Sequence, residues 1–238
     1  MIKAILFDFG QTLADSAEGF RLAEKGAETR MFEDLGLASW QDFLSDYRKA
    51  RQEFHANSNF SRVALWQGIY LHYGRGAGAA FLQVIEHDYW ETVRSKTRLF
   101  PETKAVLGQL ASGYRLALIT NTQGQGISGG HRISLFPDLE TFFEIIIVAG
   151  EAGVPPKPNR TPFLICLEKL GLLPSEAVYV GDDLRIDIRG AQNVGIQPIW
   201  LKHHSVPRKW PEVETSAPVI NSLEQLVPLL ERICHSFS

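Results

Sequence analysis

The chain has 238 residues, of which 45% are apolar and 21% are charged, a composition that is ordinary for a soluble globular protein. Its net charge of -3 and the lack of any long basic run argue against a surface for nucleic acid or anionic membrane. No apolar stretch approaches the roughly 20 residues of a membrane-spanning helix, and Asp8 interrupts the first apolar run too early for a signal peptide. The two cysteines, Cys166 and Cys234, fall within helical patterns and are expected to be packed thiols, which favours a reducing, cytoplasmic location.

The first predicted element is a strand at Ile2–Phe7. This run is almost wholly apolar, is too short for a typical helix and is bounded by Gly10, which indicates a buried strand. Asp8 follows at once, and open α/β sheets bind their ligands at the carboxyl ends of such strands. A carboxylate buried there must be paired, hydrogen-bonded or bound to metal. The alternative is a strand end whose Asp or Thr only caps the next helix.

The pattern from Ala17 to about Thr97 is helical. Aromatic and aliphatic residues recur at spacings of three and four, and Asp15 and Ser16 offer caps before the first helix. Three interruptions divide the pattern, at Gly36, 57–59 and 74–76. Four helices with no strand between them predict a small bundle, inserted after the first strand.

Beyond this block, predicted strands and helices alternate, as in a parallel sheet with right-handed crossovers. The strands are expected at 114–121, 144–149, 177–180, 198–201 and 218–220. The helices are expected at 102–112, 161–170, 186–194 and 223–233, and the second of these starts at Thr161 with Pro162 in its first turn. The stretch 123–130 is rich in Gly and Gln and is expected to be a loop beside the site.

Residues with useful chemistry stand at the ends of these elements. Thr120 and Asn121 end one strand, and Lys157 lies in a turn whose flanking prolines fix its backbone. The strand at 177–180 runs directly into a group of acids, namely Asp182, Asp183 and, further on, Asp187. Taken singly, each residue has an ordinary explanation in strand propensity, surface exposure or helix capping.

Together, these motifs closely resemble the haloacid dehalogenase-like hydrolase superfamily. Its pattern reads D-x-D-x-T, then Thr or Ser, then Lys, then G-D-x-x-x-x-D, and the resemblance extends from Ile2 to about Leu230. The resemblance implies a doubly wound, Rossmann-like α/β core with a parallel sheet, made of residues 1–16 and 98–238. Residues 17–97 then resemble the family's C1-type cap, a helical bundle that closes over the active site and selects the substrate.

The resemblance also implies roles for individual residues. Asp8 is expected to be the nucleophile that forms an aspartyl-phosphate, and Lys157 to be the cation that neutralises it. Thr120 and the backbone N–H of Asn121 are expected to bind a phosphate oxygen. The expected ligands of a Mg²⁺ cofactor are Asp8, Asp182 and the backbone carbonyl of Gly10.

Four supporting residues complete the predicted site: Gln11, Thr12, Asp183 and Asp187. Asp187 matches the second acid of the last motif, which ligates the metal through water or holds Lys157. Asp183 stands where many family members have Ser, and it is either an extra acid beside the metal or a helix cap. Gln11 could polarise a water molecule.

The departure from the family pattern lies at Gly10, where the phosphatases carry a second Asp as general acid/base. Such a group typically contributes ~10²–10⁴-fold to the rate. The first interpretation is still a Mg²⁺-dependent phosphatase of a small phosphorylated metabolite. Its leaving group would be activated, as in acyl or anomeric phosphates, or assisted by water or a cap residue. If only the acid is missing, Gly10→Asp should raise turnover.

Other interpretations stay open. A 2-haloacid dehalogenase also lacks the second Asp but needs no metal, which would leave Asp182, Asp183 and Asp187 near the site without a cation. A phosphonate hydrolase would use a cap lysine, with Lys25 or Lys49 as candidates. A non-catalytic ligand-binding or regulatory relative would bind Mg²⁺ and phosphate without turnover.

Further polar candidates come mainly from the predicted cap. The histidines that could assist acid–base chemistry are His55, His72, His87 and, after the second motif, His131. Arg21 and Arg51 could bind an acidic substrate, although structural or surface roles are favoured for all of these residues. The expected partner is a small phosphorylated substrate, with no nucleic acid and no membrane, and the chain is expected to be a monomer or a homodimer.

Overall fold

The computed structural model describes residues 1–57, 59–122, 131–206 and 209–235, so the predicted loop at 123–130 lies outside the described residues. The chain folds into two compact units. The core unit consists of Met1–Ala17, Arg98–Asn121 and Arg132–Ser238, and the helical unit consists of Glu18–Thr97 with Thr122–His131.

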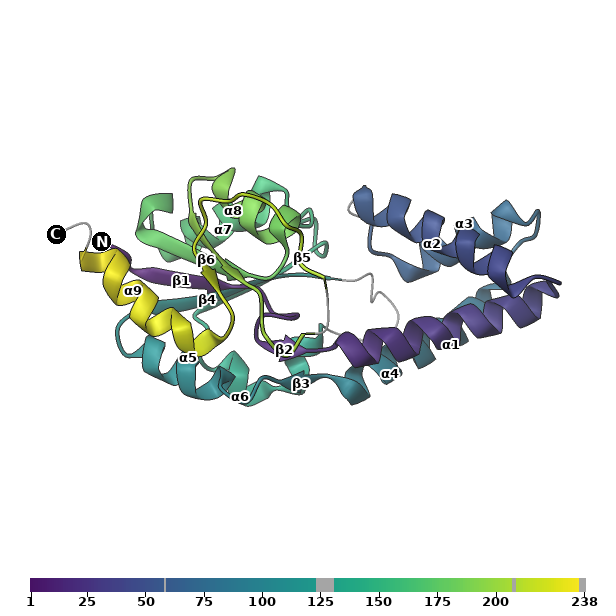
Figure 1. Ribbon diagram of the computed structural model, residues 1–238, viewed down its shortest axis with the longest axis horizontal. Helices are drawn as coiled ribbons and strands as arrows, with labels where there is room; N and C mark the ends of the chain where they lie inside the picture. Colours follow the sequence, from purple (N-terminus) through teal and green to yellow (C-terminus); the bar gives the residue numbers. More distant parts are fainter. Residues whose placement is uncertain (58, 123–130, 207–208, 236–238) are drawn as a thin grey trace. The chain divides into compact units, whose positions relative to one another are not determined.

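The core unit is built on a six-stranded sheet of order β5-β4-β1-β6-β7-β8, in which every neighbouring pair is parallel (Figure 1). Its strands are β1 (Ala4–Phe7), β4 (Arg115–Asn121), β5 (Ile145–Ala149), β6 (Ala177–Gly181), β7 (Gln197–Leu201) and β8 (Val219–Ile220). The predicted doubly wound parallel sheet is confirmed.

Helices cover both faces of this sheet. Along β1, Ile5 and Phe7 pack into one apolar core with α5, α6 and α9, while Ala4 and Leu6 pack into the other with α7 and α8. The helices are α5 (Thr103–Ala111), α6 (Pro137–Glu140), α7 (Arg160–Leu170), α8 (Arg189–Gln192) and α9 (Leu226–His235). A strand buried on both faces has no polar side, which explains why the first apolar run shows no alternation.

The strand order places the start of the chain at the centre of the sheet. From β1 the chain builds β4 and β5 on one side, and then returns to build β6, β7 and β8 on the other. The direction of winding therefore reverses at β1, and ligands of open α/β sheets bind at the carboxyl ends of strands at such a point. Asp8 directly follows β1 and lies at this point.

Several predicted boundaries were wrong by a few residues. Helix α7 begins at Arg160, because the side chain of Asn159 caps it by accepting a hydrogen bond from the Thr161 N–H at 2.9 Å. The helix predicted at 186–194 begins earlier, as a π-helical turn at Leu184–Ile188 that leads into α8. Short 3₁₀ turns at Arg132–Leu135, Pro174–Glu176 and Leu223–Gln225 were not predicted.

A two-stranded antiparallel ribbon was also missed. It pairs β2 (Ala14–Asp15) with β3 (Arg98–Leu99), the segments where the chain leaves the core unit and returns to it. The side chain of Thr103 reinforces this ribbon by donating to the carbonyl of Leu13 at 2.8 Å. Strands of two residues are too short to produce a period in the sequence.

The helical unit contains the four predicted helices, α1 (Ala17–Leu35), α2 (Trp40–Ala56), α3 (Arg62–His72) and α4 (Ala79–Lys96). Ser39 and Ser61 cap α2 and α3 by accepting backbone N–H groups of the first turn. The aromatic residues at helical spacing form the core, among them Phe43, Trp66 and Trp90. Among the described residues, no helix is both long and apolar enough to cross a bilayer.

A buried ion pair lies within this aromatic core. The carboxylate of Glu24 accepts hydrogen bonds from Tyr47 at 2.7 Å and Tyr89 at 2.9 Å, and it lies 3.5 Å from the Arg62 guanidinium. Burial alone would raise the pKa of Glu24, but the charge of Arg62 and the hydroxyl of Tyr47 outweigh it and hold that pKa below its usual value. The resulting stabilisation is complete above the ordinary pKa of glutamate, and is lost as the pH falls through the lower pKa of the folded state.

We therefore expect Arg62→Met to lower the free energy of unfolding by about 3–5 kcal/mol, because it leaves the Glu24 carboxylate buried without its cation. The matched control is Arg30→Met, which removes the exposed Arg30–Asp88 pair (2.6 Å) and should cost less than about 1 kcal/mol. Urea unfolding followed by tryptophan fluorescence measures both. Equal losses in the two variants would contradict a stabilising role for the buried pair.

Candidate active site

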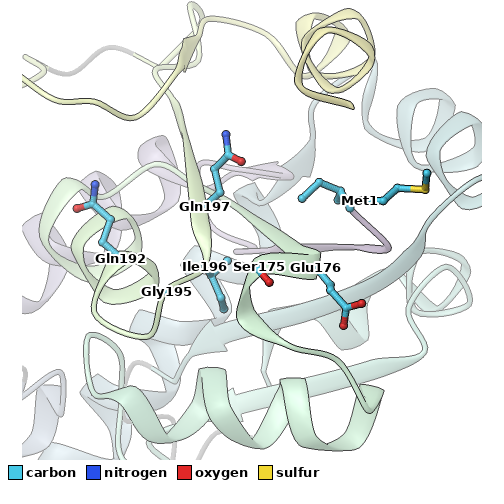
Figure 2. Close-up of a pocket in the computed structure, with 8 residues that line it drawn as sticks. Met1, Ser175, Glu176, Gln192, Gly195, Ile196 and Gln197 are labelled. Atoms are coloured by element: carbon cyan, nitrogen blue, oxygen red, sulfur yellow. The ribbon is translucent and has the colours of Figure 1, made fainter. Parts of the chain in front are cut away.

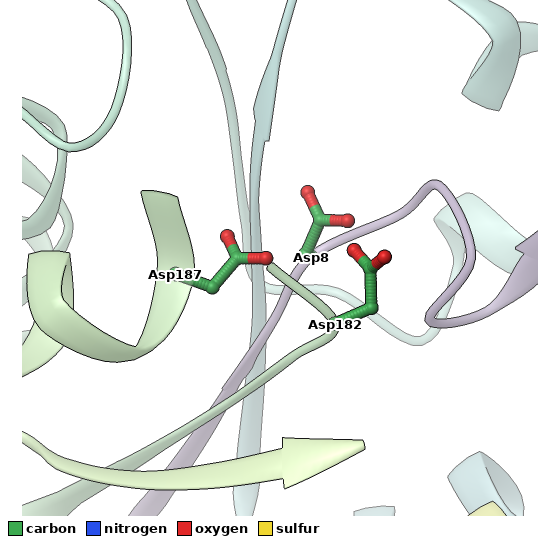
Figure 3. Close-up of side chains that lie close together, drawn as sticks. All are labelled: Asp8, Asp182 and Asp187. Carbon is green, nitrogen blue, oxygen red and sulfur yellow. The ribbon is translucent and has the colours of Figure 1, made fainter. Parts of the chain in front are cut away.

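Three buried carboxylates meet at the carboxyl end of the sheet, contributed by Asp8 after β1, Asp182 after β6, and Asp187 in the π-helical turn. Figure 3 shows their side chains directed toward one another. One oxygen from each lies within 4.8 Å of the other two. Three negative charges so close together in a buried site require positive charge between or beside them.

Lys157 supplies one such charge. Its side chain is 1% exposed, and Nζ donates to Asp8 Oδ1 at 2.8 Å, to Asp187 Oδ1 at 2.7 Å and to the Tyr179 hydroxyl at 2.7 Å. Burial alone would lower the pKa of Lys157, but the carboxylates of Asp187 and Asp8 outweigh burial and raise that pKa above its usual value. The ammonium group therefore stays charged, and each of its three N–H groups has an acceptor.

The backbone of Lys157 is fixed by Asn121 at the end of β4. Oδ1 of Asn121 accepts from the Lys157 N–H at 2.8 Å, and Nδ2 donates to the Lys157 carbonyl at 3.0 Å. The sequence had suggested a phosphate-binding role for the backbone of Asn121, and this second role of its side chain was missed. Thr120 is buried beside it in the same strand.

Tyr179 is a site residue that the sequence analysis did not identify. It lies in β6 with no exposed surface, and its hydroxyl donates to the carbonyl of Ile119 at 2.9 Å while accepting from Lys157. Burial, with the charges of Asp187 and Asp8, raises the pKa of Tyr179 well above its usual value, so the hydroxyl stays protonated. A tyrosine in an otherwise apolar strand was the available signal.

Asp183 and Asp187, for which the sequence left two roles open, have different partners. Asp183 caps the following turn, since its Oδ1 accepts the N–H groups of Arg185 at 2.9 Å and Ile186 at 2.8 Å. Asp187 binds Lys157 through Oδ1, and through Oδ2 it accepts the N–H of Asp183 at 3.0 Å. The contacts thus match the capping alternative for Asp183 and the lysine-holding alternative for Asp187.

Comparison with known proteins identifies the class to which this geometry belongs. The family model described as haloacid dehalogenase-like hydrolase matches residues 2–195, which include all three acids and Lys157. The chain belongs to the haloacid dehalogenase-like hydrolase family. The resemblance inferred from the sequence motifs is thereby confirmed.

Individual relatives cover nearly the whole chain. A glyceraldehyde 3-phosphate phosphatase of Pyrococcus furiosus is 30% identical over 233 residues, which are 97% of this chain and 94% of the relative. A 2-haloacid dehalogenase of Pseudomonas syringae pv. Tomato has a TM-score of 0.65 at 26% identity, covering 98% of this chain and 99% of its own. A hydrolase of Bacillus subtilis, bound to magnesium, has a TM-score of 0.65 at 24% identity, covering 96% and 98%.

The loop after Asp8 is tightly turned. Thr12 is fully buried, and its hydroxyl lies 3.4 Å from Asp8 Oδ2. Gln11 adopts a left-handed backbone conformation, with φ of 59°, and its amide group lies beside Asp15 and the N–H of Ala17. The Gln11 side chain therefore serves the turn, and these contacts give no support to the predicted activation of water by its amide.

The other polar candidates have ordinary surroundings. Lys25, Lys49, Arg21, His72 and His87 are exposed, as their sequence patterns favoured. Arg51 lies 3.5 Å from Glu24, and one ring nitrogen of His55 lies 3.2 Å from Arg62, so both belong to the buried network of the helical unit. His131 is buried. None of these contacts marks a cap residue as acid or base.

A hollow in the core unit lies at the end of the sheet opposite the acid cluster. It has a volume of about 600 Å³ and is lined by residues at the amino ends of β1, β6 and β7, among them Ile2, Glu176 and Gln197 (Figure 2). Its one charged side chain, Glu176, is paired with Lys3. The charged side chain of this hollow is therefore already paired, whereas the acid cluster lies at the other end of the sheet.

The donor set of the acid cluster fits a hard divalent cation. Carboxylate oxygens are the ligands that Mg²⁺ prefers in proteins. Asp187 accepts hydrogen bonds through both oxygens, from Lys157 and from the Asp183 N–H, and Asp8 accepts from Lys157 and Thr12. The Trp200 indole donates to the backbone carbonyl of Asp182 at 2.9 Å. The cluster of Asp8, Asp182 and Asp187 is therefore a candidate metal site.

Gly181 is required for this arrangement, because a Cβ atom at that position would lie 2.5 Å from Cβ and Cγ of Asp187. We expect Gly181→Ala to displace Asp187 from Lys157 and to lower the free energy of unfolding by about 1–3 kcal/mol. The control is Gly113→Ala, where an added Cβ meets nothing within 4 Å and should be neutral or stabilising by up to about 1 kcal/mol. Thermal unfolding separates the two, and a tolerated Gly181→Ala would contradict the close packing of Asp187.

Proposed function

We propose that the chain is a Mg²⁺-dependent phosphatase that hydrolyses a small phosphorylated metabolite through an aspartyl-phosphate on Asp8. The observation that carries this proposal is the Asp8 carboxylate, buried where the winding of the sheet reverses. Lys157 lies 2.8 Å from it, and two further acids lie beside it. A similarity to a glyceraldehyde 3-phosphate phosphatase over 97% of the chain supports the same chemistry.

In this mechanism Asp8 attacks phosphorus and Lys157 stabilises the negative charge that both groups carry. Lys157 holds the nucleophile in place because Asp187, Tyr179 and the side chain of Asn121 fix the lysine in turn. Thr120, at the end of the neighbouring strand, is assigned to the phosphoryl oxygens. Water then hydrolyses the aspartyl-phosphate and regenerates the carboxylate.

The residues assigned to Mg²⁺ are Asp8, Asp182 and the backbone carbonyl of Gly10. When bound, Mg²⁺ supplies positive charge between the anionic phosphate and the anionic nucleophile. The acid cluster also weighs against dehalogenation as the main activity. A dehalogenase needs no metal, so Lys157 alone would have to balance the negative charge of three buried carboxylates. A phosphonate hydrolase would require a cap lysine, but both candidates, Lys25 and Lys49, are exposed.

The direct test is phosphate release from 4-nitrophenyl phosphate with Mg²⁺ and with a chelator. We expect metal-dependent turnover that falls by at least ~10³-fold in Asp8→Asn, since the amide is no nucleophile. Retained turnover in Asp8→Asn would refute the assignment of the nucleophile. Turnover of 2-haloacids without turnover of phosphate esters would indicate dehalogenation. No turnover of either class would indicate a binding protein.

Adjacent aspartates provide a matched test of the metal ligands. We expect Asp182→Asn to weaken Mg²⁺ binding at least ~10-fold in calorimetric titration, because it removes a charged oxygen ligand. We expect Asp183→Asn to keep the affinity, because the Asp183 carboxylate caps a turn and Asn is also a good cap. A loss of affinity in Asp183→Asn equal to that in Asp182→Asn would contradict this division of roles.

A further inference from the structure

A buried cation lies beside the position at which this chain departs from the phosphatase pattern. Arg132 is 3% exposed, and its Nη2 lies 3.2 Å from the place that a Cβ atom at Gly10 would take. Its Cζ lies 5.6 Å from the centroid of the Phe9 ring, a cation–π contact. The guanidinium group therefore lies directly against the space that a side chain at residue 10 would occupy, two residues after Asp8.

The other charged groups of the core unit indicate a function for this guanidinium. Lys157 is fully committed, because its three N–H groups are engaged by Asp8, Asp187 and Tyr179. Lys157 can therefore stabilise the nucleophile by a hydrogen bond and the phosphoryl group through its charge. It has no N–H left for a hydrogen bond to the departing oxygen. Among the described residues of the core unit, Arg132 is the other buried lysine or arginine.

Burying a guanidinium is costly, and a protein keeps such a group where its charge is used. An arginine is a poor general acid, because it holds its proton at any physiological pH. It is a good partner for an oxygen that becomes negative, since its planar fork presents several N–H donors. Arginine fingers of phosphoryl-transfer enzymes act on this principle.

We propose that Arg132 is a catalytic residue that binds the leaving-group oxygen and stabilises it as an anion, in the place of the missing acid. This inference rests on the proposed phosphatase function. An oxygen of Asp8 forms a bond to phosphorus while the bond from phosphorus to the leaving oxygen breaks. The electron pair stays on that oxygen, which departs as an anion beside Arg132, and solvent protonates it after release.

The proposal defines a substrate class. A cation lowers the energy of a leaving anion but supplies no proton, so the best substrates are those whose leaving group is already a stable anion. Acyl phosphates, phosphoanhydrides and phenolic esters meet this condition, whereas simple alkyl phosphates leave as strongly basic alkoxides. The expected substrate is therefore an activated phosphate and not an ordinary sugar or alcohol monoester.

The test uses a series of substituted phenyl phosphates, from 2,4-dinitrophenyl phosphate to phenyl phosphate, which differ only in the basicity of the leaving phenolate. Values of kcat/KM are compared for the wild-type enzyme, Arg132→Gln and Arg132→Lys, with Mg²⁺. We expect Arg132→Gln to lose roughly 10²–10³-fold with phenyl phosphate and less than about tenfold with the dinitrophenyl ester. Arg132→Lys keeps the charge and should keep a dependence close to that of the wild type.

An equal loss across the series in Arg132→Gln would overturn the proposal, because a purely structural or phosphoryl-binding arginine affects all members alike. An unchanged series would overturn it as well. The proposed function is judged separately by Asp8→Asn in the same assay. Turnover that depends on Asp8 with parallel losses in Arg132→Gln refutes the role of Arg132 alone, whereas turnover independent of Asp8 refutes both.

A second variant decides the matter if Arg132→Gln does not fold. Gly10→Asp places a carboxylate beside Nη2 of Arg132, where only the flexible end of a side chain must move. We expect this carboxylate to pair with the guanidinium and to withdraw it from the leaving group, so that phenyl phosphate is hydrolysed at least tenfold more slowly. Faster hydrolysis of phenyl phosphate, which the sequence alone had suggested, would overturn the proposal.

Discussion

The ammonium group of Lys157 is the constraint on which the rest of the core unit depends. Three carboxylates whose oxygens lie within 4.8 Å of one another repel strongly in a site from which water is largely excluded. The contacts of Nζ with Asp8 and Asp187, at 2.8 and 2.7 Å, offset this repulsion at two of the three acids. Under the proposed function, a divalent cation would offset the charge of the third acid, Asp182. In that proposal, Lys157 neutralises one part of the site permanently, and the metal neutralises the other part when it is bound.

Local features of the sequence serve this one interaction. The prolines around residue 157 and the side chain of Asn121 hold the lysine backbone, and Tyr179 receives the third N–H of its ammonium group. Gly181 leaves room for Asp187 to approach the strand. These residues lie on three separate segments of the chain, so the site forms only when the sheet has its final strand order. Catalytic geometry and folding of the core are therefore coupled.

The sequence predicted those parts of the molecule that depend on local pattern. Apolar runs located the strands, and helical spacing located the four inserted helices. Polar residues at strand ends located Asp8 and Asp182, and a proline-flanked turn located Lys157. Tyr179 left only a weak local signal, a tyrosine in an apolar strand, and the side-chain role of Asn121 left none, because both roles depend on which residues face each other across the sheet. Arg132 was missed for the same reason, since its closeness to Gly10 joins segments more than a hundred positions apart. Asn159, by contrast, was a local cap that could have been recognised.

The ribbon of β2 and β3 has a consequence for how such chains evolve. Ala14 pairs with Leu99 and Asp15 with Arg98, so the chain leaves the core unit and re-enters it at neighbouring points. A segment of any length can be spliced between two adjacent points without altering the strands on either side, because the distance it must bridge is already closed. The core can therefore keep its chemistry while the inserted helices are exchanged, lengthened or remodelled.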